Sequence, residues 1–145
     1  MAADGPAPDK ARGVIRRGVL WAVLLLALAG CGGEDDTTAR GAAEAFLDWH
    51  YVEIDLPKSR EFTVGLARSK VDEQIRLTAG QAIDAGTRKP RVYYKLLEER
   101  EARGRTAFLY QLTIRPEEGG EFNRRLLIRV RREEAGWRVS NYMEY

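Results

Sequence analysis

Two residues with distinctive chemistry occur once each in this 145-residue chain, Cys31 and His50. A cysteine thiolate is a nucleophile and a metal ligand, and a histidine ring exchanges a proton near pH 7. One cysteine cannot form a disulfide within the chain. One cysteine, one histidine and scattered carboxylates also fall short of the ligand set of a zinc site. We therefore expect no metal site, no cofactor and no catalytic group that residue spacing alone would reveal.

Cys31 comes directly after an apolar segment. Arg16 and Arg17 precede residues 19–29 (VLWAVLLLALA), a run of eleven without a charge. A membrane-spanning helix needs about 20 apolar residues, so this run is short for a permanent span and has the length of a signal-peptide core. The pattern predicts a signal peptide over residues 1–30.

The tetrapeptide Leu28-Ala29-Gly30-Cys31 resembles the lipobox of bacterial lipoproteins. The resemblance implies that the Cys31 thiolate receives a diacylglyceryl group and that Cys31 becomes the first residue after cleavage. Stable anchoring needs more than one acyl chain, and a diacylated or triacylated cysteine meets that condition. The predicted partner is then a membrane, bound through the lipid on Cys31. The alternative is an ordinary small buried cysteine.

Residues 31–38 join the lipidated cysteine to the rest of the chain. The sequence GGEDDTT after Cys31 is small, polar and acidic, which predicts a flexible tether. Seven residues reach at most roughly 25 Å, so the folded part would lie close to the membrane. We expect a lipid-anchored protein of the bacterial cell envelope. In a Gram-negative cell, Gly32 in place of aspartate resembles lipoproteins of the outer membrane, where this domain would face the periplasm.

The charges balance once the leader is set aside. From Cys31 onward the chain carries 20 basic and 20 acidic residues, because residues 1–30 hold four of the basic and two of the acidic ones. A strongly basic nucleic-acid-binding protein is therefore excluded, and we expect no nucleic-acid partner.

The remainder is predicted to be one α+β domain over residues 39–145. Apolar residues first recur at three- and four-residue spacing, which predicts a helix that ends before Pro57 and a second helical segment over residues 58–84, bent or divided at Gly65. The period then becomes two, with turn residues between the runs. Four strands are predicted, over residues 91–100, 105–115, 122–132 and 137–144. Short links favour an antiparallel meander with the helices packed on one face of the sheet.

This layout resembles the nuclear transport factor two-like superfamily, which includes ketosteroid isomerase, scytalone dehydratase and small bacterial lipoproteins. The resemblance rests on an Ala-x-x-Phe-Leu-x-x-His helix (43–50), an Asp-Leu-Pro break (55–57) and a meander ending in Gly-Trp-Arg-Val (136–139). It implies a cone-like domain in which the helices cover a curved four-stranded sheet. It also implies that the sheet's outer face can form a homodimer, and we expect aromatic residues there: Tyr93, Tyr142 and Tyr145.

In the resembling fold, His50 would face the mouth or interior of the cone. Strand alternation places Tyr110 and Asn141 on the same inner face, so all three are candidate pocket-lining residues. The alternative is that each is a packing residue with its polar tip hydrogen-bonded. The inner face is otherwise predicted to be apolar and to carry no Asp or Glu. Its expected members are Phe108, Tyr110, Leu112, Ile114, Leu126, Ile128, Val130, Trp137, Val139, Asn141 and Met143.

Arginines are frequent in the last two predicted strands, and three of them, Arg129, Arg131 and Arg138, share the exposed face. One interpretation is an anionic partner such as a lipid head group, a cell-wall polymer or an acidic protein. The other is a solvated sheet face with cross-strand ion pairs.

The function predicted from the sequence is a non-catalytic accessory or binding domain, anchored in the envelope, whose partner is an envelope protein or a small ligand. Isomerases of the resembling fold use carboxylates inside the cone, and none is expected here. The alternative is a small-molecule-binding protein, or an isomerase- or dehydratase-like enzyme, that uses the cone cavity.

Overall fold

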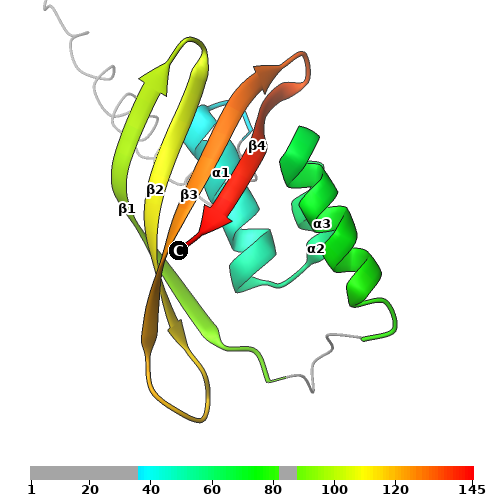
Figure 1. The fold of residues 1–145 in the computed structure, drawn as a ribbon, viewed down its shortest axis with the longest axis vertical. Coiled ribbons are helices and arrows are strands. Elements are labelled where there is room, and N and C mark those ends of the chain that lie inside the picture. The colour runs from blue at the N-terminus through cyan, green and yellow to red at the C-terminus, as the bar shows by residue number, and fades with distance from the viewer. Residues whose placement is uncertain (1–35, 82–87) are drawn as a thin grey trace, which may run out of the picture. The chain divides into compact units, whose positions relative to one another are not determined.

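The computed structural model describes residues 36–81 and 88–145. The predicted signal peptide, Cys31 and the tether up to residue 35 lie outside the described residues, as do residues 82–84 of the second helical segment. Within the described parts, helices precede a four-stranded antiparallel sheet and lie on one side of it (Figure 1). The predicted α+β class is confirmed. No helix among the described residues is long and apolar enough to cross a membrane.

The helical part consists of α1 (Ala39–Leu47), the π-helical turn η1 (Asp48–Val52), α2 (Leu56–Glu61) and α3 (Gly65–Leu77). Thr38 caps α1, because its hydroxyl accepts a hydrogen bond from the backbone N–H of Gly41 at 2.9 Å. Asp55 caps α2 in the same way, through the N–H of Lys58 at 2.9 Å. Both caps satisfy backbone donors that have no partner inside their helix.

The sheet contains β1 (Arg91–Ala102), β2 (Arg105–Arg115), β3 (Phe122–Glu133) and β4 (Gly136–Glu144). Its order is β1-β2-β3-β4 and every pair is antiparallel, so the predicted meander is confirmed. In Figure 1 the β1–β2 and β3–β4 turns lie together at the top, and the β2–β3 turn extends to the bottom.

The core lies between α1 and the inner face of the sheet. Ala43, Phe46 and Leu47 of α1 are fully buried. Burial of a phenylalanine or leucine side chain stabilises a fold by about 1.5–3 kcal/mol. From the sheet, the fully buried apolar and aromatic residues are Phe108, Tyr110, Leu112, Leu126, Ile128, Val130 and Val139.

The segment between α2 and α3 pairs with the free edge of β4. The N–H of Val139 donates to the carbonyl of Phe62 at 2.8 Å, and the N–H of Val64 donates to the carbonyl of Val139 at 2.9 Å. Gly65 follows with φ of 56°, a left-handed conformation that glycine adopts readily. One continuous helix from residue 58 is therefore not formed; Gly65 divides the segment, and α3 ends at Leu77.

A β-bulge in β4 changes which side chains point inward. Val139 lies opposite Val130, but the next residue of β3, Arg129, lies opposite Asn141. Ser140 is thus an extra residue on the bulged strand, and the alternation shifts by one position beyond it.

The bulge makes the predicted inward or outward direction wrong at four positions, residues 141–144. Tyr142, expected on the outer face, points into the core and is only 7% exposed. Met143, expected inside, is 52% exposed, and Asn141 takes a register position on the outer face. Trp137 does face the core side, where it is half-buried and lies beneath the guanidinium of Arg132 at 5.9 Å from the ring centroid.

Alanine substitutions on either side of the bulge test this register. Tyr142→Ala should lower the free energy of unfolding by about 3–5 kcal/mol, because it empties an aromatic-sized volume in the core. Met143→Ala should change it by less than about 0.5 kcal/mol, as an exposed position does. Chemical denaturation of the two variants beside the parent measures both values, and the reverse order would show that β4 has no bulge.

Candidate functional site

His50 lies in an aromatic cluster beneath the sheet. Its ring stacks on Phe46 with centroids 4.8 Å apart and contacts the rings of Tyr51 at 4.7 Å and Tyr142 at 5.2 Å. The imidazole is 6% exposed. The π-helical turn and the bulge of β4 bring these rings together, since one supplies His50 and Tyr51 and the other turns Tyr142 inward.

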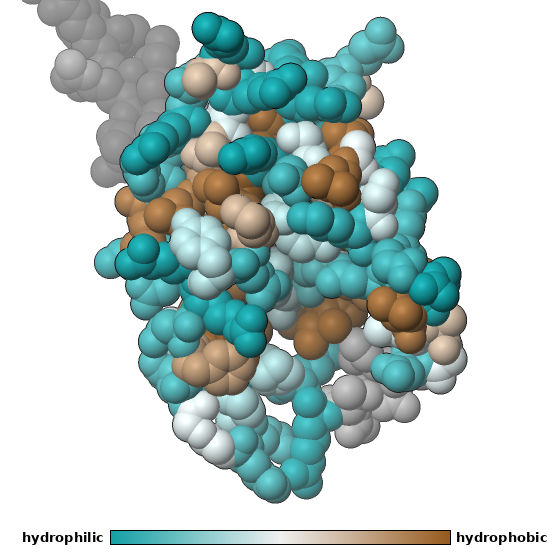
Figure 2. Space-filling model, in the orientation of Figure 1, coloured by the Kyte–Doolittle hydropathy of each residue, from teal (hydrophilic) through white to brown (hydrophobic). Residues whose placement is uncertain are grey.

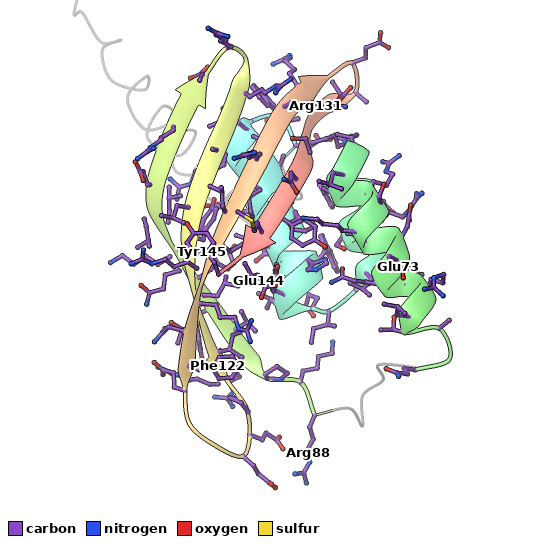
Figure 3. The ribbon with its side chains drawn as sticks, viewed as in Figure 1. Glu73, Arg88, Phe122, Arg131, Glu144 and Tyr145 are labelled. Atoms are coloured by element: carbon purple, nitrogen blue, oxygen red, sulfur yellow. The ribbon has the colours of Figure 1, made fainter. Side chains whose placement is uncertain are left out.

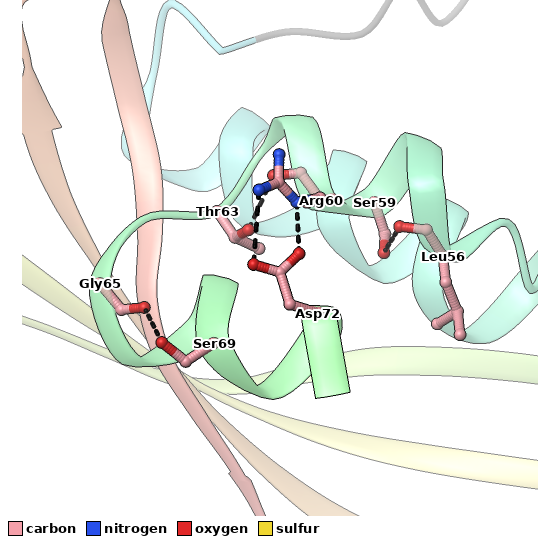
Figure 4. A network of polar contacts seen from close by, with 7 residues as sticks. All are labelled: Leu56, Ser59, Arg60, Thr63, Gly65, Ser69 and Asp72. Carbon is pink, nitrogen blue, oxygen red and sulfur yellow. Dashed lines mark hydrogen bonds and ion pairs between the residues drawn. The ribbon is translucent and has the colours of Figure 1, made fainter. Parts of the chain in front are cut away.

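One hydrogen bond fixes the orientation of the His50 ring. The hydroxyl of Ser59 donates to the carbonyl of Leu56 at 3.0 Å (Figure 4). Its oxygen is therefore left to accept from Nδ1 of His50, 3.2 Å away, and we assign the proton of the neutral ring to Nδ1. Burial lowers the pKa of His50 to about 4. At neutral pH the ring is uncharged and is a weak base, poorly matched to proton transfer at that pH.

Tyr110 is fully buried, and its ring contacts involve other residues than those of His50. Its ring packs edge-on against Tyr94 at 5.8 Å and lies 6.2 Å from Phe108. Its hydroxyl is buried and has no hydrogen-bond partner among the described residues. Burial raises the pKa of Tyr110, so the phenol stays protonated at neutral pH.

Asn141 does not join the other two predicted residues. Its side-chain oxygen accepts from the ammonium of Lys70 at 3.0 Å, and that ammonium also donates to the carbonyl of Tyr142 at 2.6 Å. Asn141 therefore ties α3 to β4. The three candidate pocket residues occupy three separate sets of contacts, and the expectation that Asn141 faces the cone interior is wrong.

Two carboxylates near the sheet's inner face were not expected from the sequence. Asp48, in the π-helical turn, accepts a hydrogen bond from the hydroxyl of Tyr94 in β1 at 2.8 Å. Glu144 takes an inward register position opposite Leu126 and accepts from the hydroxyl of Tyr51 at 2.7 Å (Figure 3). Burial raises the pKa of Asp48, with the Tyr94 hydrogen bond opposing the rise. A carboxylate with a raised pKa is the kind of group that exchanges protons in an active site.

Two grooves are open to solvent beside these groups. One, of about 490 Å³, runs between η1, α2 and the end of α3 and is lined mainly by Trp49, Ile54, Leu56, Ile75 and Lys89. The other, of about 520 Å³, lies between α3 and the end of β4. Neither is lined by His50, Tyr110, Asn141 or Asp48. Among the residues that the structure describes, no group of three or more His, Cys, Asp or Glu side chains could hold a metal ion.

Comparison with known proteins establishes the fold. No family model matches the chain, and no curated protein matches it. Among solved structures, it resembles a putative calcium/calmodulin-dependent protein kinase type II association domain from Thiobacillus denitrificans. The TM-score is 0.58 at 19% identity, over 74% of this chain and 93% of that one.

Two further structures have similar backbones. A designed nuclear transport factor two-like protein has a TM-score of 0.54 at 16% identity, over 76% of this chain and 98% of that one. RPA3114, a SEC-C motif-containing protein from Rhodopseudomonas palustris, has a TM-score of 0.54 at 13% identity, over 75% and 80%. The domain therefore has a nuclear transport factor two-like fold, as the sequence layout predicted. Structural similarity at such low sequence identity shows the fold and does not show the activity.

His50 should give stability a specific pH dependence. Because its folded-state pKa of about 4 lies below the ordinary 6.5, the unfolded chain takes up the proton first. His50 therefore contributes stability above pH 6.5 that is lost as the pH falls towards 4, up to about 3 kcal/mol. His50→Leu should remove this part of the loss in denaturant titrations at each pH. Since His50 is the only histidine, parallel curves for parent and variant would contradict the buried neutral ring.

Tyr110 should tolerate loss of its hydroxyl. Tyr110→Phe removes a buried group that has no hydrogen-bond partner and leaves the ring in place, so stability should be unchanged or rise by about 1 kcal/mol. Thermal unfolding measures the effect. For comparison, Tyr94→Phe should be destabilising, because it removes the hydroxyl that donates to the exposed Asp48 carboxylate. Destabilisation by Tyr110→Phe would reveal a polar partner for this hydroxyl.

Proposed function

We propose that this protein is a bacterial lipoprotein, anchored in the cell envelope through Cys31, whose folded part is a non-catalytic accessory or binding domain. The observation that carries the anchoring is the sequence Leu28-Ala29-Gly30-Cys31 at the end of an apolar run. A lipid on this cysteine would hold the domain at a membrane surface, facing the periplasm from the outer membrane in a Gram-negative cell.

The folded domain supports a short connection to such an anchor. The carbonyl of Asp36 accepts from the N–H of Trp137 at 3.0 Å, and its carboxylate pairs with Arg138 at 2.6 Å. The chain is thus attached to β4 from Asp36 onward. Four residues, 32–35, separate this point from Cys31. They span at most roughly 14 Å, which is shorter than the full predicted tether.

The interior supports a role that does not depend on catalysis. Three side chains capable of acid–base chemistry are each hydrogen-bonded to another side chain: the buried His50 to Ser59, the exposed Asp48 to Tyr94 and the exposed Glu144 to Tyr51. The groove beside Trp49 is lined by none of these three side chains and is large enough for a small ligand, whereas Glu144 lines the other groove. An envelope protein or a small molecule at such a groove would be the partner.

One observation favours a second candidate, an isomerase- or dehydratase-like enzyme. Asp48 has a raised pKa and lies beside Tyr94, and a carboxylate with a nearby phenol can move a proton next to a carbonyl. Such an enzyme would need a cavity that brings its substrate to Asp48. A structure with the interior opened around Asp48 would favour this candidate over the binding domain.

Cys31→Ser tests the anchor. Cells fed labelled palmitate should incorporate the label into the parent protein, which should sediment with membranes. The Cys31→Ser variant should take up no label and keep the mass of the uncleaved precursor, because serine has no thiolate to accept the lipid. Gly33→Ser is the matched control and should be labelled like the parent. Label in the Cys31→Ser protein would overturn the assignment of the lipobox.

A further inference from the structure

The strand register gathers basic residues on the outer face of the sheet, the face turned away from the helices. Nine of its positions are lysine or arginine and two are glutamate, Glu98 and Glu133. This count contrasts with the even balance of charges from Cys31 onward. The nine basic residues are Arg91, Lys95, Arg100, Arg105, Arg115, Arg125, Arg129, Arg131 and Arg138.

Several of these basic residues lie opposite other basic residues. Arg105, Arg131 and Arg138 lie directly opposite one another on three adjacent strands. Like charges in such positions destabilise a sheet. Four of the nine basic residues have an acidic partner, namely Arg100, Arg115, Arg131 and Arg138. In residues 36–81 and 88–145, no ion pair engages the other five.

An apolar row crosses the middle of this basic face. Leu109 and Leu127 lie opposite each other and Met143 completes the row. Tyr93 and Tyr145 add aromatic rings on the same face, 49% and 61% exposed. Figure 2 shows hydrophobic side chains gathered over the middle of the strands, with hydrophilic ones around them. Arginine, tyrosine and aliphatic side chains in this arrangement suit the boundary between lipid head groups and acyl chains.

We propose that the outer face of the sheet lies against the membrane that carries the anchor and binds acidic phospholipid head groups there. The inference rests on the proposed lipidation of Cys31, which lies five residues before Asp36. Asp36 is paired with Arg138, itself a member of the basic face, so the first described residue of the chain lies beside that face. One lipid-bearing residue together with a basic patch is a sufficient combination for a stable, oriented attachment.

A second copy of the chain fits this face less well. A two-fold dimer through the sheet would place the same surface of each copy against the other. Each copy has nine basic and two acidic residues on this face, so the two positively charged faces would repel each other. Acidic head groups instead supply the missing negative charge and leave the apolar row in contact with lipid.

Reaction of lysines with an amine reagent tests the orientation. Lys95 is exposed on the outer face and Lys89, just before β1, is exposed outside it. The full protein, purified from membranes in detergent, is placed in vesicles of phosphatidylcholine alone or mixed with phosphatidylglycerol. Mass spectrometry of peptides then reports both lysines in one molecule. Lys95 should react several-fold more slowly on the mixed vesicles only, and Lys89 should react equally on both.

Charge reversals supply the matched control. Arg125→Glu with Arg129→Glu should abolish the protection of Lys95, since each basic residue at an acidic surface contributes roughly fivefold in binding. Arg60→Glu with Arg76→Glu makes the same change in net charge on α2 and α3, in exposed ion pairs, and should leave the protection intact.

The outcomes separate this inference from the proposed anchor. The intact mass of the purified protein reports the lipid on Cys31, and an unlipidated protein can be mixed with the same vesicles and read in the same way. Protection of Lys95 that is equal on both vesicles and in detergent would indicate a dimer through the sheet and overturn the inference. Rapid reaction of Lys95 under every condition would overturn it as well.

Discussion

The free edge of β4 is the constraint on which the rest of this domain depends. An edge strand exposes unpaired N–H and C=O groups, and proteins cover such edges. Here the backbone of Phe62–Val64 pairs with Val139, and Asp36 pairs with Trp137. Covering this edge breaks the helical segment into α2 and α3 and attaches the start of the described chain. An exposed ion pair between Arg60 and Asp72 also links α2 to α3 (Figure 4).

The bulge beside this edge determines what fills the interior. Because Ser140 is an extra residue, Tyr142 turns towards α1 and packs on Phe46 and His50. The same shift places Glu144 where the hydroxyl of Tyr51 reaches it. The hydroxyl of Tyr51 is thus satisfied across elements, whereas that of the buried Tyr110 has no partner among the described residues.

The balance of charge over the whole domain conceals a difference between its two sides. Residues 36–81, which form the helical side, carry eight acidic and six basic residues. The outer face of the sheet has nine basic and two acidic positions. A protein tethered by a few residues samples only nearby surfaces, so such a difference between sides can set its orientation. The net charge of the whole domain does not indicate this orientation.

The sequence determined the features that rest on local pattern. Strand alternation and turn residues placed four strands within a residue or two of their ends, and the Asp-Leu-Pro break at residues 55–57 marked the start of α2. The fold followed, because these elements admit few arrangements. Tertiary structure decided the inward turn of Tyr142 and the partners of Asp48 and Asn141. Each of these depends on contacts between residues far apart in the chain, as between Asp48 and Tyr94. The sequence placed three arginines, Arg129, Arg131 and Arg138, on one exposed face, but only the register showed that nine basic positions from four strands share it.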